Sequence, residues 1–402
     1  MKKKLLLLGI FCTLLLMQQP GIAQSTLDDL NQNAMKLLID GKQKEAIEEF
    51  QKIIQLDSTY VNAYINLGFV YYTNGMLDTA ISLYYKALEI DSQNPMAHNN
   101  LGSAFLAKNK HQEAIIEYLV AIKLNPAYAE AHNNLSFAYY SVGAIDKAIA
   151  EAQKAIELKP NYAKAYNYLG IAYHAKGQFD EAITQFKKAL ELSPNFIFAL
   201  NNLGTTYRTR GRIEESIQQY KQAIVLDSLN TESLNGLGLA YLNKGELQKS
   251  IDSFKRVLEI SPQNPVAHNN ISFAYYEDMN YSMAMQHAKA AERLGIKIDT
   301  KYISDLEKAL DAKYMRVRHI LVEKQAEAES ILNELKNGAH FSELAYQKSI
   351  DTNSARNGGD LGYFQKGDLL AEYEQVIEAL KIGEVSGILK TERGYHIFKR
   401  LK

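Results

Sequence analysis

Asparagine side chains recur at a fixed spacing along most of this sequence, and this is its first feature that suggests a binding role. One column repeats every 34 residues and contains Asn99, Asn133, Asn167, Asn201, Asn235 and Asn269. The next column contains Asn66, Asn100, Asn134, Asn202 and Asn270, and it is interrupted by Tyr168 and Gly236. Because an asparagine side chain both donates and accepts hydrogen bonds, such a ladder could hold an extended peptide by its backbone without reading its sequence.

Histidine is the other residue type here that could bind a metal or carry a proton. His98, His132 and His268 keep the same period, at equivalent positions of separate units. They fill a bulky position that packs against neighbouring helices, and no local cluster of ligands surrounds them. We therefore expect core residues and no metal site. His319 and His396 lie outside the periodic region, and by themselves they could be structural residues that bond across strands.

The asparagine columns belong to a unit that repeats every 34 residues. Two columns of small residues flank a bulky column. A fixed period of this length predicts a repeat array of short amphipathic helices, in which each unit buries its apolar face only by stacking on its neighbours. The small columns let the two helices of a unit approach closely. They read Gly68, Gly102, Ser136, Gly170, Gly204, Gly238 and Ser272, then Ala80, Ala114, Ala148, Ala182, Ser216, Ser250 and Ala284.

This layout resembles the tetratricopeptide repeat column by column, which implies an all-α superhelix. In that family the first helix of each unit lines the inner face, so the asparagine columns are expected to face a groove for a peptide or protein ligand. For the second column the alternative is structural, because asparagine is common there in such repeats and could bond neighbouring helices; the first column is less expected from the repeat pattern. The first unit departs from the pattern, with Ala34 and Leu37 in the glycine and tyrosine columns. Eight units fit residues 27–298, beginning near Leu27, Val61, Pro95, Ala129, Ala163, Ile197, Thr231 and Pro265.

Bulk composition narrows the classes of function. The chain has 402 residues, 47% of them hydrophobic, which favours a folded protein with more than one structural unit. A net charge of −1 gives no global field that would attract nucleic acid or an anionic membrane. The only cysteine is Cys12, in the N-terminal segment, so we expect no disulfide and no catalytic thiol in the mature chain.

Residues 1–23 have the three parts of a secretory signal peptide. Three lysines precede an apolar run, Leu5–Met17, and small residues stand at Gly21 and Ala23. The run is shorter than the about 20 residues of a membrane span. We predict cleavage after Ala23 and export of a bacterial protein to the periplasm or beyond, with no stable membrane span afterwards. Lipidation of Cys12 is the alternative, but Phe11 occupies the position where a small residue is needed.

After the repeats the pattern of the sequence changes twice. Residues 299–314 have helical spacing of apolar residues and a polar opposite face, which predicts a helix that caps the last repeat. From residue 315 the period ends. We expect strands at 316–322, 386–390 and 395–399, helices at 324–337, 341–348 and near 371–380, and a turn-rich loop at 349–364. Helices against a small antiparallel sheet make residues 315–402 an α+β domain.

Four short sequence motifs in this domain resemble those of the parvulin-type peptidyl-prolyl isomerases and follow one another in the same order as in that family. They are HILV at 319–322, NGGDLGYF at 357–364, LKIGEVSGIL at 380–389 and GYHIFK at 394–399. The resemblance implies that His319 and His396 are the two histidines of the catalytic pocket, with Asp351 and Thr391 beside them. It also implies an apolar pocket for the proline ring, formed by Leu361, Phe364, Leu369 and Tyr373. Tyr373 and Leu369 depart from the more usual phenylalanine and methionine.

The reaction of such a domain needs neither a nucleophile nor a cofactor. Rotation about an Xaa–Pro bond faces a barrier of about 20 kcal/mol because amide resonance is lost in the twisted state. A dry pocket that clamps the proline and stabilises the twisted amide is sufficient. The sequence therefore predicts an exported peptidyl-prolyl cis–trans isomerase whose array recruits proline-containing clients or partner proteins. The alternative is an interaction scaffold whose parvulin-like module binds without catalysis.

Overall fold

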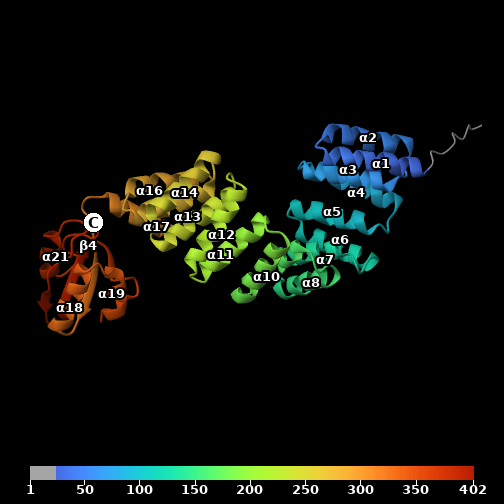
Figure 1. Ribbon diagram of the computed structural model, residues 1–402. Helices are drawn as coiled ribbons and strands as arrows, with labels where there is room; N and C mark the ends of the chain where they lie inside the picture. Colours follow the sequence, from blue (N-terminus) through green and yellow to red (C-terminus); the bar gives the residue numbers. More distant parts are fainter. Residues whose placement is uncertain (1–23) are drawn as a thin grey trace, which may run out of the picture. The chain divides into compact units, whose positions relative to one another are not determined.

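A computed structural model describes residues 24–402, and the predicted signal peptide with its cleavage site and Cys12 lies outside the described residues. The chain consists of two compact units, with the boundary between Thr206 and Tyr207 inside α11. Helices form the first unit and the start of the second, and a small sheet lies only near the C-terminus (Figure 1). No helix of the described residues is long and apolar enough to cross a membrane.

The repeat region is built of helices that follow one another in pairs. Each pair corresponds to one unit of the 34-residue period. The pairs are α1 (Gln24–Ile39) and α2 (Gln43–Leu56), α3 (Val61–Thr73) and α4 (Leu77–Ile90), α5 (Pro95–Ala107) and α6 (His111–Leu124), α7 (Ala129–Ser141) and α8 (Ile145–Leu158), α9 (Ala163–Ala175) and α10 (Phe179–Leu192), α11 (Ile197–Thr209) and α12 (Ile213–Leu226), α13 (Thr231–Lys244) and α14 (Leu247–Ile260), and α15 (Pro265–Glu277) and α16 (Tyr281–Arg293).

Close approach of the two helices explains the small columns. A Cβ atom at Gly238 would lie 2.5 Å from the ring of Phe254, so only glycine leaves room for that ring. Gly170 makes the same space for Phe186. Where the column carries serine, the hydroxyl is used: Ser136 Oγ donates to the carbonyl of Ala148 at 2.7 Å. These contacts fill the space between the paired helices.

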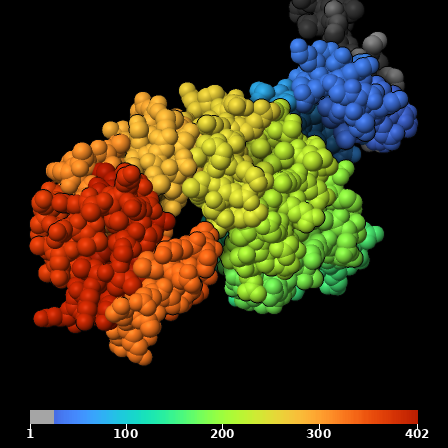
Figure 2. Space-filling view, turned by 60° about the vertical axis from the view of Figure 1, so that its left-hand side comes forward, coloured from blue at the N-terminus to red at the C-terminus, as the bar shows by residue number. Residues whose placement is uncertain are grey.

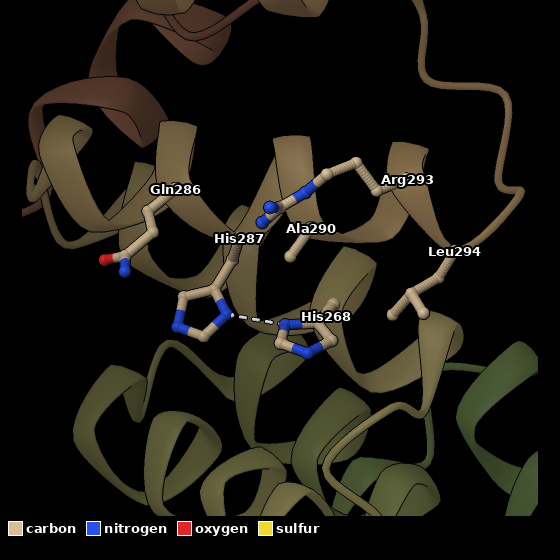
Figure 3. A pocket seen from close by; sticks show the side chains of 6 residues that line it. All are labelled: His268, Gln286, His287, Ala290, Arg293 and Leu294. Atoms are coloured by element: carbon tan, nitrogen blue, oxygen red, sulfur yellow. Dashed lines mark hydrogen bonds between the residues drawn. The ribbon is translucent and has the colours of Figure 1, made fainter.

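The periodic histidines pair with the second helix of their own unit. The Nδ1 atoms of His98 and His132 lie 2.6 Å from the carboxylates of Glu117 and Glu151. In the last unit His287 replaces the glutamate, and its Nδ1 lies 2.9 Å from Nδ1 of His268 (Figure 3). The two rings point toward one another beside a cavity of about 400 Å³. Burial, the charge of His268 and that of Lys255 lower the pKa of His287 to about 4.

The C-terminal domain is a four-stranded antiparallel sheet with helices on both faces. Strand order is β2-β1-β4-β3. Ile320, Val322 and Ile397 pack against α18 and α19 on one face, and Val317 and Phe398 pack with α21 on the other. The elements are β1 (Met315–Val322), α18 (Gln325–Lys336), α19 (Phe341–Lys348), α20 (Thr352–Ala355), β2 (Asp360–Phe364), α21 (Ala371–Glu378), β3 (Leu389–Thr391) and β4 (Gly394–Arg400).

Two expectations for this domain were wrong. The segment 349–364 is not a loop throughout, because it contains α20 and the edge strand β2. β2 lacks the regular alternation of buried and exposed residues that marks a strand, because its pairing with β1 is irregular and Gly362 has a φ of 78°. The strand expected at 386–390 begins only at Leu389. At Ser386 the side-chain oxygen, rather than the backbone carbonyl, accepts from the amide of Phe398, which interrupts the ladder.

The capping helix connects the array to this domain by direct contacts. α17 (Thr300–Leu310) buries Leu306 against the last repeat, and Tyr302 bonds Ser272 at 2.8 Å. On the other side, Lys402 Nζ donates to the carbonyls of Lys308 and Asp311, each at 2.5 Å. The C-terminal domain therefore lies directly against the end of the array (Figure 2).

We predict that the His268–His287 pair makes the last repeat less stable at acidic pH than at neutral pH. Below pH 6.5 the unfolded chain binds a proton at His287 that the folded chain takes up only near pH 4, so stability falls across this window. His287→Glu restores the histidine–glutamate pair. We expect it to stabilise α15 and α16 by about 1 kcal/mol at pH 5 and by less at pH 8, measured by native-state hydrogen exchange.

The reverse substitution, glutamate to histidine in an earlier unit, provides the control. Glu151→His beside His132 should weaken α7 and α8 on acidification. If His287→Glu has the same effect at pH 5 and pH 8, the titration account is wrong.

Candidate active site of the C-terminal domain

Strand register brings the two predicted histidines together. His319 on β1 pairs with Phe398 on β4, and Leu321 pairs with His396. His319 and His396 are therefore diagonal neighbours on one face of the sheet. Nε2 of His319 lies 2.8 Å from Nδ1 of His396, the rings are inclined by 14°, and both side chains are buried.

The hydrogen bonds around this pair run in one direction. A carboxylate can only accept, so His319 Nδ1–H donates to Asp351 Oδ2, at 3.4 Å. This leaves His319 Nε2 to accept from His396 Nδ1–H, and His396 Nε2 to accept in turn. Its donors are the hydroxyls of Thr391 at 2.8 Å and Tyr373 at 3.3 Å. Both histidines are thus satisfied as neutral rings.

The pKa shifts agree with this assignment. Burial lowers the pKa of His319, although Asp351 opposes the change. Burial, followed by the charges of His319 and Arg393, lowers the pKa of His396 to about 4. For Asp351, burial raises the pKa, but hydrogen bonds from Ser354 and His319 outweigh it, and the pKa is lowered overall. At neutral pH the network has two neutral histidines and one carboxylate.

Backbone contacts hold the segments that carry Asp351 and Gly359 against β1. The amide of Ile350 donates to the carbonyl of Leu321 at 2.8 Å, which places the following residue, Asp351, near His319. Gly359 has a φ of 84°, and a Cβ there would lie 2.4 Å from the carbonyl oxygen of His319. Glycine is required because only its backbone can come this close to the strand.

The predicted apolar residues share one cluster beside the histidines. Phe364 and Tyr373 are buried in it, and Leu361 and Leu369 are partly buried at its edge. The hydroxyl of Tyr373 bonds His396, so it belongs to the network as well as to the apolar wall. Such a wall next to neutral rings can hold a small apolar ring and exclude water. The structure therefore brings together all eight residues predicted for this domain.

Two residues of the site were missed. Phe398 stacks on His319, with ring centroids 4.9 Å apart, and Ser354 Oγ donates to Asp351 Oδ2 at 2.7 Å. Phe398 lies in the GYHIFK phrase two residues after His396, so strand alternation would have placed it on the same face. Ser354 follows Asp351 by three residues, the spacing of one helical turn.

The predicted groove asparagines lie deeper than expected. Asn99, Asn133, Asn167 and Asn201 are only 1–6% exposed, and Asn235 and Asn269 are partly buried. The second column bonds the first: Asn134 Nδ2 donates to Asn99 Oδ1 at 3.0 Å, and Asn202 does the same to Asn167. These bonds join neighbouring repeats, which corresponds to the structural alternative for that part of the ladder.

In residues 24–402 no group of three or more His, Cys, Asp or Glu could hold a metal ion.

Family models match both regions. The PPIC-type PPIASE domain matches residues 319–402. The tetratricopeptide repeat matches residues 61–94 and 163–196, with another match at 186–218. A further TPR repeat model matches 37–75, 102–143, 138–177, 204–245 and 238–278. The chain is a tetratricopeptide repeat protein with a C-terminal PPIC-type peptidyl-prolyl isomerase domain.

Relatives by sequence match through the C-terminal domain. A foldase protein PrsA of Geobacillus sp. (strain WCH70) is 44% identical over 104 residues, 26% of this chain and 37% of the relative. A parvulin-like PPIase of Rickettsia bellii (strain RML369-C) is 42% identical over 105 residues, 25% of this chain and 36% of the relative. The chain thus spans little more than a third of the length of these curated relatives.

Among solved structures, the APC/C hetero-tetramer Cut9-Hcn1 supports the helical fold. Its similarity has a TM-score of 0.57 at 19% identity, over 72% of this chain and 57% of that chain. At this identity the likeness shows the fold alone. The family models and the fold therefore establish the family of the chain, and the geometry of the site must support its chemistry.

The Thr391 hydroxyl is the shorter of the two donors to His396 Nε2, which gives a test of the geometry of the network. Thr391→Val leaves His396 Nε2 with only the longer bond from Tyr373. We expect a loss of about 1 kcal/mol in the protection of β1 and β4 amides from hydrogen exchange. Thr391→Ser keeps the hydroxyl and should lose little. Equal losses in the two variants would contradict the role of this bond.

Proposed function

We propose that this protein is an exported peptidyl-prolyl cis–trans isomerase and folding factor whose repeat array recruits client or partner proteins. The observation that carries the proposal is the closed hydrogen-bond network of Asp351, His319 and His396 beside an apolar wall. Four separate segments of the domain supply this arrangement, in a domain of the PPIC-type family. A domain that served only as a scaffold would not need a buried histidine–aspartate network beside an apolar wall.

The geometry accounts for catalysis of bond rotation. A planar Xaa–Pro amide has a resonance dipole that water stabilises, and the twisted amide has lost much of it. A buried, apolar site removes that water and so favours the twisted form relative to the planar one. Leu361, Leu369 and Tyr373 would clamp the proline ring while the preceding carbonyl rotates beside the histidines. Because the rings are neutral, they do not stabilise the planar carbonyl as a cation would.

In the first compact unit, the interruption of the ladder at Tyr168 marks the part best suited to an extended client. Tyr168 stands where an asparagine would donate to Asn133, and Asn133 Oδ1 is left buried without a hydrogen-bond partner. The Tyr168 ring stacks on Phe137 instead, with centroids 5.0 Å apart. Stacked aromatic rings at this interruption suit a peptide that offers an apolar side chain.

A small cavity lies next to these rings. It has a volume of about 190 Å³ and is lined by Tyr140, Ile171, His174, Phe186, Asn202, Thr205 and Thr206. The rings of Tyr140 and Phe137 also stack, with centroids 6.0 Å apart, so the cavity lies beside the stacked rings. This volume accommodates one or two side chains of an extended peptide. We propose that Tyr168 and Phe137, with this cavity, form the client-contacting part of the first unit.

Export rests on residues 1–23, whose charged, apolar and small-residue parts form a signal peptide with cleavage after Ala23. The expected clients are then proline-containing polypeptides outside the cytoplasm. N-terminal sequencing of the protein secreted by a bacterial host tests this point. A mature chain that retains Met1 would contradict it.

Isomerase activity is tested by exchange spectroscopy on short Xaa–Pro peptides, with the full mature chain as catalyst. His396→Ala and Asp351→Ala should each reduce kcat/KM by about 10- to 100-fold, because each breaks the network at the reacting amide. His340→Ala, an exposed histidine outside the network, is the matched control and should keep full activity. No acceleration by the folded wild-type chain would favour the non-catalytic scaffold.

Client binding is tested with a fluorescently labelled, permanently unfolded polypeptide. Tyr168→Asn should restore the asparagine ladder and remove the stacked ring, so we expect at least about threefold weaker binding without loss of stability. Tyr85→Asn changes an exposed tyrosine on α4 and serves as the matched control. Equal binding by both variants and the wild type would remove this part of the array from the proposed groove.

A further inference from the structure

A third cavity lies between the last repeat and the C-terminal sheet, within the second compact unit. Its volume is about 510 Å³. α18 and α19 cover only the part of this sheet face that carries Ile320, Val322 and Ile397. The other part, toward the start of β1 and the end of β4, faces the repeat. The lining residues are Tyr276, Glu277, Met279, Tyr281, Arg316, Arg318, Asn357, Asp360, Gly383, Lys399, Arg400 and Leu401.

Two cations, Arg318 and Lys399, lie side by side in this cavity, and the carboxylate opposite Arg318 on the other side, that of Asp360 on β2, is paired with Arg316. Arg318 on β1 and Lys399 on β4 are partners in the strand register, so their side chains leave the same face at the same level. Like charges in directly opposed positions destabilise a sheet. The Nε of Arg318 is buried and has no hydrogen-bond partner, and within residues 24–402 neither side chain forms an ion pair.

The other charged groups of the cavity are already engaged or lie at its rim. Asp360 accepts from Arg316 Nε at 3.0 Å and from the amide of Gly362 at 2.8 Å. Arg316 also donates to the hydroxyl of Tyr276 at 2.6 Å, and this contact joins the two walls. Arg400 Nη1 donates to the carbonyl of Leu380 at 2.8 Å. Glu277 is exposed. Asp360 faces both Arg316 and Arg318 but bonds Arg316, so Arg318 and Lys399 carry an excess of positive charge.

We propose that this cavity binds an acidic polypeptide segment, with a carboxylate placed between Arg318 and Lys399. A guanidinium and an ammonium on adjacent strands can hold the two oxygens of one carboxylate through charge-assisted hydrogen bonds. Tyr276, Met279 and Leu401 line the same cavity. These apolar groups favour a peptide, whose neighbouring side chains they can contact, over a bare inorganic anion.

This site is separate from the isomerase pocket. Successive residues of a strand point to opposite faces, so Arg318 faces the repeat while His319 faces the apolar wall. Binding there needs no proline. An acidic segment could therefore be retained by the protein while a different segment of the same chain occupies the pocket.

The test uses the full mature chain and a fluorescein-labelled peptide of glutamate, leucine and glycine without proline, followed by fluorescence anisotropy. The double variant Arg318→Gln, Lys399→Gln should bind at least about tenfold more weakly. Lys324→Gln, Lys336→Gln is the matched control, since it removes the same charge from exposed positions of the same domain and should bind as the wild type does. A lysine-rich peptide of equal length should not bind.

Lys399→Glu separates lost binding from lost folding. It places an acid opposite Arg318 and replaces repulsion by attraction, so its melting temperature should be equal to or above that of the wild type while the acidic peptide no longer binds. Three results would overturn the proposal: no binding by the wild type, equal loss in the matched control, or full binding by Lys399→Glu. Complete displacement of the peptide by an equal concentration of inorganic phosphate would show a simple anion site and contradict the peptide assignment.

Discussion

The hydrogen bond between His319 and His396 depends on one constraint, the antiparallel register of β1 and β4. That register places the two rings diagonally on one face and stacks Phe398 against His319. A shift by one residue would send His396 to the other face of the sheet. The loops that carry Asp351 and Gly359 bond to the backbone of the same strand, β1. The site is therefore assembled around this strand pair, and its geometry is as rigid as the sheet.

β1 also connects the site to the array. Residues of this strand alternate between the isomerase face, through Val317 and His319, and the face toward the repeat, through Arg316 and Arg318. Arg316 contacts both Asp360 in the domain and Tyr276 in the last repeat. One strand thus contributes to the proposed active site and to the junction with the array.

Much of this arrangement could be predicted from the sequence, because repetition and phrase order are strong signals. The 34-residue period predicted the helix pairs, and the parvulin-like phrases predicted which histidines meet. The limits are physical. β2 was missed because its pairing is irregular, and Ser354 carries no signal until its partner Asp351 is known. Asparagine periodicity shows that a column exists, but only packing shows that Asn134 is already bonded to Asn99.

The chemistry of the site depends most directly on the protonation of the two histidines. Long-range ¹H–¹⁵N correlation spectra of the imidazole rings, recorded on the mature chain at pH 7, report which nitrogen carries the proton. The network predicts two neutral rings, each with its proton on Nδ1, because His319 donates to Asp351 and His396 donates to His319. Detection of a doubly protonated ring, or of the proton on Nε2 of His396, would contradict the one-way network and the neutral pocket built on it.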